Sequence, residues 1–166
     1  MHITNFYFEP GDIVLISNNG LFPSLISKFT NSKWTHAVIY VGYFQGHDMF
    51  IESGLLGVNY TTLDRFRGMD YCVLRSSLSL NTINLTMGDI RFNLGKKYDY
   101  KGLLGYMLYK WKKITFQDPA ELFCSELIVS SFNKCGDLFN EKPLSVWSPD
   151  DIYTYDKLKV LYEARL

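Results

Sequence analysis

One cysteine, one histidine and one glutamate have the residue types that nucleophilic catalysis needs. Cys124 lies in the apolar string FCSELIVSSF, His36 begins the run HAVIYVG, and Glu52 follows the run MFI. A thiolate attacks a carbonyl carbon, an imidazole takes and returns the proton, and a carboxylate orients the imidazole and stabilises its charged form. The Cys124 backbone N–H with a second donor would bind the oxyanion. These residues predict a thiol hydrolase with Cys124 as nucleophile, His36 as base and Glu52 as third member.

Each of these residues also has an ordinary structural interpretation. The positions that share one helical face with Cys124 are Leu127, Ile128, Phe132 and Cys135. Free cysteine is among the most buried residue types, so this face suits a packed core. His36 alone suits a core or strand-edge histidine, and Glu52 alone suits a carboxylate at the end of a strand. Periodicity leaves both interpretations of Cys124 open.

The position of Cys124 within its helix is also open. Asp118, Pro119 and Glu121 match a capping box with proline at the first helical position, which puts Cys124 in the second turn. A nucleophile favours the first turn, where unpaired N–H groups and the helix dipole stabilise a thiolate. The alternative is a separate turn over 118–122 and a main helix that begins near Cys124.

The remaining histidines and cysteines form no metal or disulfide pattern. His2 lies close to the N-terminus, and His47 is expected in a solvated hairpin turn. The cysteines are Cys72, Cys124 and Cys135, an odd number without close pairs, which is typical of a reducing compartment. No two of them have the spacing of zinc ligands. The sequence therefore implies no disulfide, metal or organic cofactor.

The first half of the chain is predicted to form a mostly antiparallel sheet. The predicted strands are 12–17, 35–44, 48–53, 57–63 and 71–76, with a helix at 21–32. The gap after residue 44 has the size of a hairpin turn. The run 35–44 is almost continuously apolar, which predicts a strand buried on both faces.

The second half of the chain has helical spacing. Helices are predicted at 79–95, ending at Gly95, at 98–113, and around Cys124 with Gly136 as C-cap. A serine-capped turn at 148–153 and a last strand at 157–164 follow. Strands first and helices second predict an α+β domain.

Length and composition limit the class of protein. The chain has 166 residues, 47% of them hydrophobic, which predicts a single domain over residues 1–166. Lys and Arg balance Asp and Glu at 17 each, so no nucleic-acid partner is expected. No signal peptide is apparent, and the apolar stretch 102–111 is too short to span a bilayer, so a cytoplasmic location is predicted.

Taken in order, the motifs resemble the circularly permuted branch of the NlpC-type papain-like cysteine hydrolases. Most papain-like enzymes place the cysteine helix before the histidine strand, whereas His36 here precedes Cys124. The chain is most similar to the YiiX/YaeF-like group of amidases and more distantly to lecithin retinol acyltransferase. The matching strings span about residues 8–153 and are PGDIVLI at 10–16, SKWTHAVIYVG at 32–42, FIESGLLGV at 50–58, GKKYDY at 95–100, FCSELI at 123–128 and SPDDI at 148–152.

The resemblance implies a papain-like core, in which a helix bearing Cys124 packs on an antiparallel sheet bearing His36. It carries Cys124, His36 and Glu52 over as nucleophile, base and polar third member. Tyr98 and Ser125 become candidate substrate or oxyanion contacts. The alternatives are that Tyr98 is a structural aromatic and that Ser125 supports the helix. Asp12 is expected to bind nearby backbone at the start of its strand.

Three functions follow as hypotheses. The first is a cysteine hydrolase that cleaves a peptide, isopeptide or acyl-amino-acid amide in a small molecule or peptide through a thioacyl intermediate. The second is a lipid-directed acyltransferase or thioesterase, with 102–111 as a peripheral membrane contact. The NCEHF-type string of the acyltransferases is replaced by FCSEL, which disfavours it. The third is a binding module with an inert cysteine.

Overall fold

The computed structural model describes residues 6–17, 33–54, 56–97 and 124–166. Within these residues, six strands form an antiparallel sheet in the order β4-β3-β2-β1-β5-β6. The strands are β1 (Ile13–Ile16), β2 (His36–Phe44), β3 (His47–Gly54), β4 (Gly57–Thr61), β5 (Asp70–Ser76) and β6 (Leu158–Arg165). The predicted helices at 21–32 and 98–113 and the predicted cap at 118–121 lie outside the described residues.

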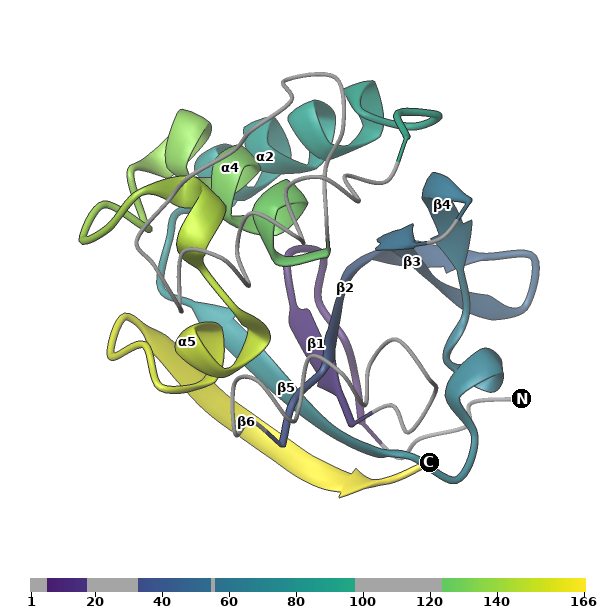
Figure 1. Cartoon of the computed structure of the whole chain (residues 1–166). Coiled ribbons are helices and arrows are strands. Elements are labelled where there is room, and N and C mark those ends of the chain that lie inside the picture. Colours follow the sequence, from purple (N-terminus) through teal and green to yellow (C-terminus); the bar gives the residue numbers. More distant parts are fainter. Residues whose placement is uncertain (1–5, 18–32, 55, 98–123) are drawn as a thin grey trace.

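The described helices cover one face of this sheet. They are α2 (Leu80–Phe92), α4 (Cys124–Gly136) and the short α5 (Pro149–Tyr153), together with the 3₁₀ turn η2 (Leu144–Val146). The 3₁₀ turn η1 (Leu63–Phe66) packs against the other face. In Figure 1, α2 and α4 lie side by side, and α4 also contacts β2 and β3. This is the predicted α+β arrangement, with the cysteine-bearing helix packed on an antiparallel sheet.

Two hydrophobic clusters lie on opposite faces of the strands, because side chains alternate along a strand. Ile13, Ala37 and Ile39 belong to the cluster under α2 and α4. Val14 and Val38 belong to the cluster that η1 covers. The run 35–44 is therefore buried on both faces over most of its length, as predicted, and becomes exposed only at Tyr43 and Phe44.

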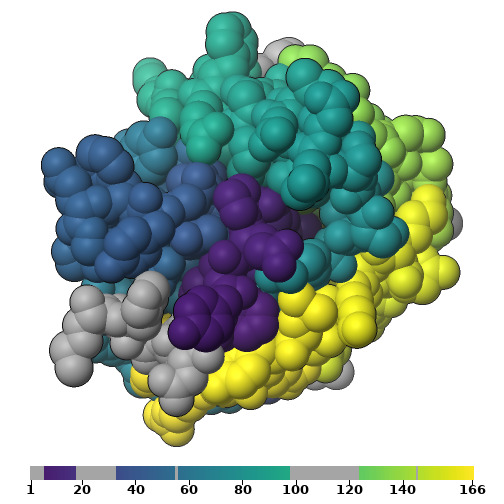
Figure 2. Space-filling model, turned by 180° about the vertical axis from the view of Figure 1, so that it is seen from behind, coloured from purple at the N-terminus to yellow at the C-terminus, as the bar shows by residue number. Residues whose placement is uncertain are grey.

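Residues from both ends of the chain lie together on the far side of the molecule. Figure 2 shows residues 6–17 (purple) between the C-terminal strand (yellow) and the segments coloured blue and teal. Asp12 is buried there and accepts hydrogen bonds from the Glu9 backbone N–H at 2.8 Å and from Arg75 Nε at 2.6 Å. Asp12 thus ties the start of β1 to nearby backbone, as expected, and also to β5.

Serine caps are observed at the start of two helices, and the one at Ser148 was predicted. Ser79 accepts a hydrogen bond from the Thr82 backbone N–H at the start of α2. Ser148 and Asp151 form a capping box at the start of α5, with Pro149 at the first helical position. Such caps satisfy N–H groups that have no partner within the helix.

The end of α4 differs from the prediction. Gly136 was expected to be the C-cap, but it is the last residue of the helix, and Asp137 takes the left-handed conformation with φ of 47°. A Cβ added at Gly136 would lie 2.7 Å from Thr82 Cγ2. Glycine is therefore needed at this position because α2 approaches closely.

Two strand boundaries also differ. The predicted strand 57–63 ends at Thr61, because Leu63 begins the 3₁₀ turn η1 and is buried in the second cluster. His47 is the exposed first residue of β3, and the hairpin turn consists of Gln45 and Gly46 with φ of 49° and 87°. Positive φ at both turn residues suits a tight antiparallel hairpin.

Candidate active site

His36 and Glu52 meet at the end of the sheet. His36 is the first residue of β2, and Glu52 lies on β3 opposite Val38. Residues two apart on a strand share a face, so His36 and Glu52 are diagonal neighbours. His36 Nε2 and Glu52 Oε2 are 2.6 Å apart, and the Glu52 side chain is only 4% exposed. The carboxylate is therefore positioned to orient the imidazole.

Cys124 reaches the same histidine from the opposite layer. It is the first described residue of α4 and is buried, and its thiol interacts with the His36 imidazole and helps to raise the pKa of that ring. Because Glu52 occupies Nε2, Nδ1 is the ring nitrogen left for the thiol. His36 thus has Glu52 at Nε2, and Cys124 acts on the same imidazole from α4.

Cys124 differs from most residues on its predicted helical face, because it is buried outside the two hydrophobic clusters. Leu127, Ile128 and Phe132 are members of the cluster between sheet and helices, as the periodicity predicted. Cys124 is buried but belongs to neither hydrophobic cluster, and Cys135 is half-buried. The structure therefore distinguishes Cys124 from the apolar residues that share its helical spacing.

The charge state of His36 follows from these contacts. Burial alone would lower its pKa, but the hydrogen bonds to Cys124 and Glu52 and the charges of both groups outweigh burial. Together they raise the pKa of His36 from 6.5 to about 9. Burial likewise acts to raise the pKa of Glu52, yet contacts with His36, Arg65 and Thr61 leave it lowered. An imidazolium beside a carboxylate is therefore the favoured state near neutral pH.

The sequence did not indicate the part played by η1. Arg65 Nη1 donates a hydrogen bond to Glu52 Oε1, so both carboxylate oxygens have a partner. The ring of Phe66 lies 5.7 Å from the His36 ring, between centroids. Spacing could have indicated that Leu63 and Phe66 are buried, but the contact of Arg65 depends on how η1 sits on the sheet.

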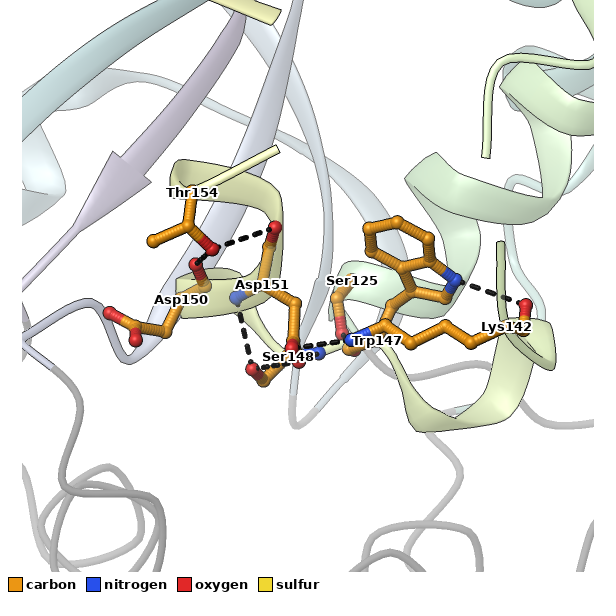
Figure 3. Close-up of polar contacts among 7 residues, drawn as sticks. All are labelled: Ser125, Lys142, Trp147, Ser148, Asp150, Asp151 and Thr154. Atoms are coloured by element: carbon orange, nitrogen blue, oxygen red, sulfur yellow. Dashed lines mark hydrogen bonds and ion pairs between the residues drawn. The ribbon is translucent and has the colours of Figure 1, made fainter. Parts of the chain in front are cut away.

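Ser125 has a structural contact. Its hydroxyl donates a hydrogen bond to the Trp147 carbonyl at 2.5 Å, and the Trp147 indole N–H donates to the Lys142 carbonyl at 3.3 Å. Figure 3 shows this link beside the capping box of Ser148 and Asp151. The contact favours the interpretation that Ser125 supports the start of α4.

The other candidates lie elsewhere. Tyr98 and the apolar stretch 102–111 fall outside the described residues. Cys72 is buried on β5, and burial together with the charge of Glu163 raises its pKa to about 12. No helix in the described residues is both long and apolar enough to cross a membrane.

Comparison with known proteins identifies relatives of this arrangement. The family model described as permuted papain-like amidase enzyme, YaeF/YiiX, C92 family, matches residues 7–150. No curated protein matches the chain.

A solved structure has the same fold. It is the crystal structure of metalloprotein yiiX from Escherichia coli O157:H7, which is 17% identical, with a TM-score of 0.72 over 95% of this chain and 98% of that one. In the part of the present chain that the structure describes, no three His, Cys, Asp or Glu side chains are grouped so that they could hold a metal ion.

Proposed function

Because the chain belongs to the family of permuted papain-like amidase enzymes, we propose that it hydrolyses amide bonds through Cys124, His36 and Glu52. Family membership itself makes the chain a cysteine hydrolase whose substrates contain an amide. The proposal adds the residues and their roles: Cys124 is the nucleophile, His36 the general base and acid, and Glu52 the residue that orients His36.

One observation carries this proposal. The His36 imidazole contacts both Glu52 and Cys124, although the three residues come from β2, β3 and α4. A thiol, an imidazole and a carboxylate in a chain of hydrogen bonds form the arrangement that activates a nucleophile. A cysteine that served only to fill the core would have no need of a charged partner.

The reaction would proceed in two halves. In the resting pair the proton of the Cys124 thiol has passed to His36, and the thiolate sulfur forms a bond to the amide carbonyl carbon. The tetrahedral intermediate collapses to a thioester, and the C–N bond breaks as His36 gives its proton to the amine. His36 then takes a proton from water, the hydroxide attacks the thioester, and the Cys124 thiolate beside the His36 imidazolium is restored as the acid leaves.

The oxyanion and the substrate belong to the same proposal. The Cys124 backbone N–H is the donor that we assign to the oxyanion, with Tyr98 as a candidate second contact. Ser125 is assigned to support of α4, because its hydroxyl proton is engaged by the Trp147 carbonyl. The substrate is proposed to be a peptide, isopeptide or acyl-amino-acid amide.

The test combines thiol reactivity with hydrolysis. Iodoacetamide labelling of each cysteine, resolved by mass spectrometry at pH 6, should modify Cys124 in the native protein, because the imidazolium favours the thiolate. His36→Ala should slow this labelling at least tenfold and abolish amide hydrolysis. His47→Ala is the matched control, since His47 is exposed on β3 and should leave both unchanged. Labelling of Cys124 only after unfolding would refute the proposal and favour an inert binding module.

The substrate panel separates amidase from acyltransferase. Peptides, isopeptides, acyl-amino acids and lipid acyl esters are supplied at equal concentration to the wild type and to Cys124→Ala. Turnover of amides that is lost in Cys124→Ala supports the proposal. Turnover confined to the lipid esters would favour the lipid-directed function instead.

A further inference from the structure

We propose that Arg65 is a positioning residue of this site, which fixes the Glu52 carboxylate behind His36 and sets the pH range of the Cys124–His36 pair. The inference rests on the proposed function of the triad, and it adds a fourth member that the sequence motifs do not contain. Arg65 acts through Glu52 rather than on the substrate.

The contacts of Glu52 divide its two oxygens between two partners. Oε2 lies 2.6 Å from His36 Nε2, while Oε1 accepts a hydrogen bond from Arg65 Nη1. Thr61 on β4 also acts on Glu52 and helps to lower the pKa of its carboxyl group. A carboxylate that is 4% exposed has lost most of its hydration and needs such partners to stay ionised. With both oxygens held, the carboxylate cannot rotate away from the imidazole.

The position of Arg65 is fixed by the residues that flank it in η1. Leu63 and Phe66 are both buried in the cluster below the turn. The Arg65 guanidinium lies 5.8 Å from the Phe66 ring centroid, and the Phe66 ring lies against His36. Core packing therefore places the guanidinium beside Glu52, although the Arg65 side chain is 57% exposed.

The same turn supplies a matched control. Arg67 is 70% exposed and pairs with Asp64 of η1, with an Nη2 to Oδ1 distance of 2.7 Å. Arg65 and Arg67 thus have the same charge, similar exposure and positions two residues apart. They differ in that Arg65 contacts the Glu52 carboxylate. Replacing each arginine by Gln therefore separates an effect that passes through Glu52 from a general loss of positive charge.

The guanidinium has two opposing effects on the site. The groups that act on Glu52 in the described part of the chain are His36 from β2, Arg65 from η1 and Thr61 from β4, and Cys124 from α4 acts on His36. Arg65 stabilises the ionised carboxylate. The Arg65 charge also offsets part of the attraction between the carboxylate and His36, and it repels the protonated imidazole. Arg65 therefore limits how strongly His36 holds its proton. Removing the charge should therefore raise the pH at which His36 loses its proton.

The experiment is an NMR pH titration of the His36 ring Cε1–H in the full chain. The sequence has only three histidines, so substitution of His2 and His47 assigns the signals. Arg65→Gln should raise the His36 midpoint by roughly 0.5 to 1 pH unit, the effect of one charge at close range in a partly exposed site. Arg65→Lys keeps the charge and should stay close to the wild type, and Arg67→Gln should leave the midpoint unchanged.

A second variant without the charge keeps the test decisive if Arg65→Gln does not fold. Arg65→Met keeps a long, unbranched side chain without the charge, and it should give the same upward shift of the His36 titration midpoint as Arg65→Gln. Midpoints in Arg65→Gln and Arg65→Met that coincide with the wild type would overturn the inference. An equal shift in Arg67→Gln would also overturn it, because the effect would then not pass through Glu52.

Iodoacetamide labelling of Cys124 in the same samples keeps the two proposals apart. A labelled Cys124 at pH 6 with an unmoved His36 midpoint would leave the triad standing and remove Arg65 from it. An inert Cys124 with a raised midpoint would refute the thiol hydrolase and leave the Arg65–Glu52–His36 coupling intact.

Discussion

Replacing Glu52 by Gln should lower the pH at which His36 releases its proton. Gln keeps the size of the side chain, and its carbonyl oxygen can still accept a hydrogen bond from His36 Nε2. The negative charge is lost, however, and Arg65 is left without its counter-ion beside the imidazole. Both changes disfavour the imidazolium, so the pKa of His36 should fall.

The size of the effect follows from the contacts of His36. The difference between the ordinary pKa of 6.5 and the pKa of about 9 in the folded protein corresponds to about 3 kcal/mol in favour of the imidazolium. Cys124 and Glu52 share this stabilisation, each through a hydrogen bond and a charge. Removing the charge of Glu52 alone should remove roughly half of it, which lowers the His36 midpoint by about one pH unit or more.

The assay is the NMR titration of His36 in the wild type, in Glu52→Gln and in Glu9→Gln. Glu9 pairs with Arg75 away from His36 and controls for the loss of a carboxylate elsewhere. The rate of Cys124 alkylation at pH 7 should fall together with the midpoint in Glu52→Gln alone. The reasoning is wrong if wild-type His36 titrates near 6.5, or if Glu52→Gln leaves its midpoint near 9.

Three further predictions concern stability and reactivity. His36 has a raised pKa of about 9, so its stabilisation of the fold should be complete below pH 6.5 and lost as the pH rises through 9. Urea unfolding at pH 6 and 9.5 should show a drop of up to about 3 kcal/mol that His36→Ala lacks, and an equal drop in the variant would contradict this. Gly136→Ala should destabilise by about 1–3 kcal/mol because of the contact with α2, while Gly88→Ala, with open space around it, should stabilise by about 0.5–1 kcal/mol. Similar urea midpoints for these two variants would refute the close approach. Cys72 should resist iodoacetamide at pH 8 in the native protein, since burial raises its pKa to about 12; mass spectrometry that finds it modified together with Cys124 would contradict its placement on β5.

Local patterns determined the elements and the identity of the candidate residues. Alternation predicted the strands, including the one that begins at His36, and helical spacing predicted α2 and the buried face of α4. The serine and proline at 148–149 predicted the start of α5. These signals are short-range, because capping and periodicity depend on residues within one or two turns of each other.

Other features depended on how the elements pack. Periodicity predicted which residues share a helical face with Cys124. It could not decide whether the Cys124 side chain contacts apolar side chains or the His36 ring. Gly136 looked like a helix terminator, whereas its lack of a side chain allows α2 to approach. In both cases the neighbour comes from a distant part of the chain.

The sequence by itself determined that the chain holds a cysteine, a histidine and a glutamate with the right chemistry, the cysteine in a predicted helix and the other two on predicted strands. Only the tertiary structure decided that His36 contacts both Cys124 and Glu52, and that Arg65 holds the second oxygen of Glu52. The physical reason is that strand register and the packing of α4 and η1 on the sheet fix these contacts. Register and packing arise from many distant side chains at once, and no local pattern encodes them.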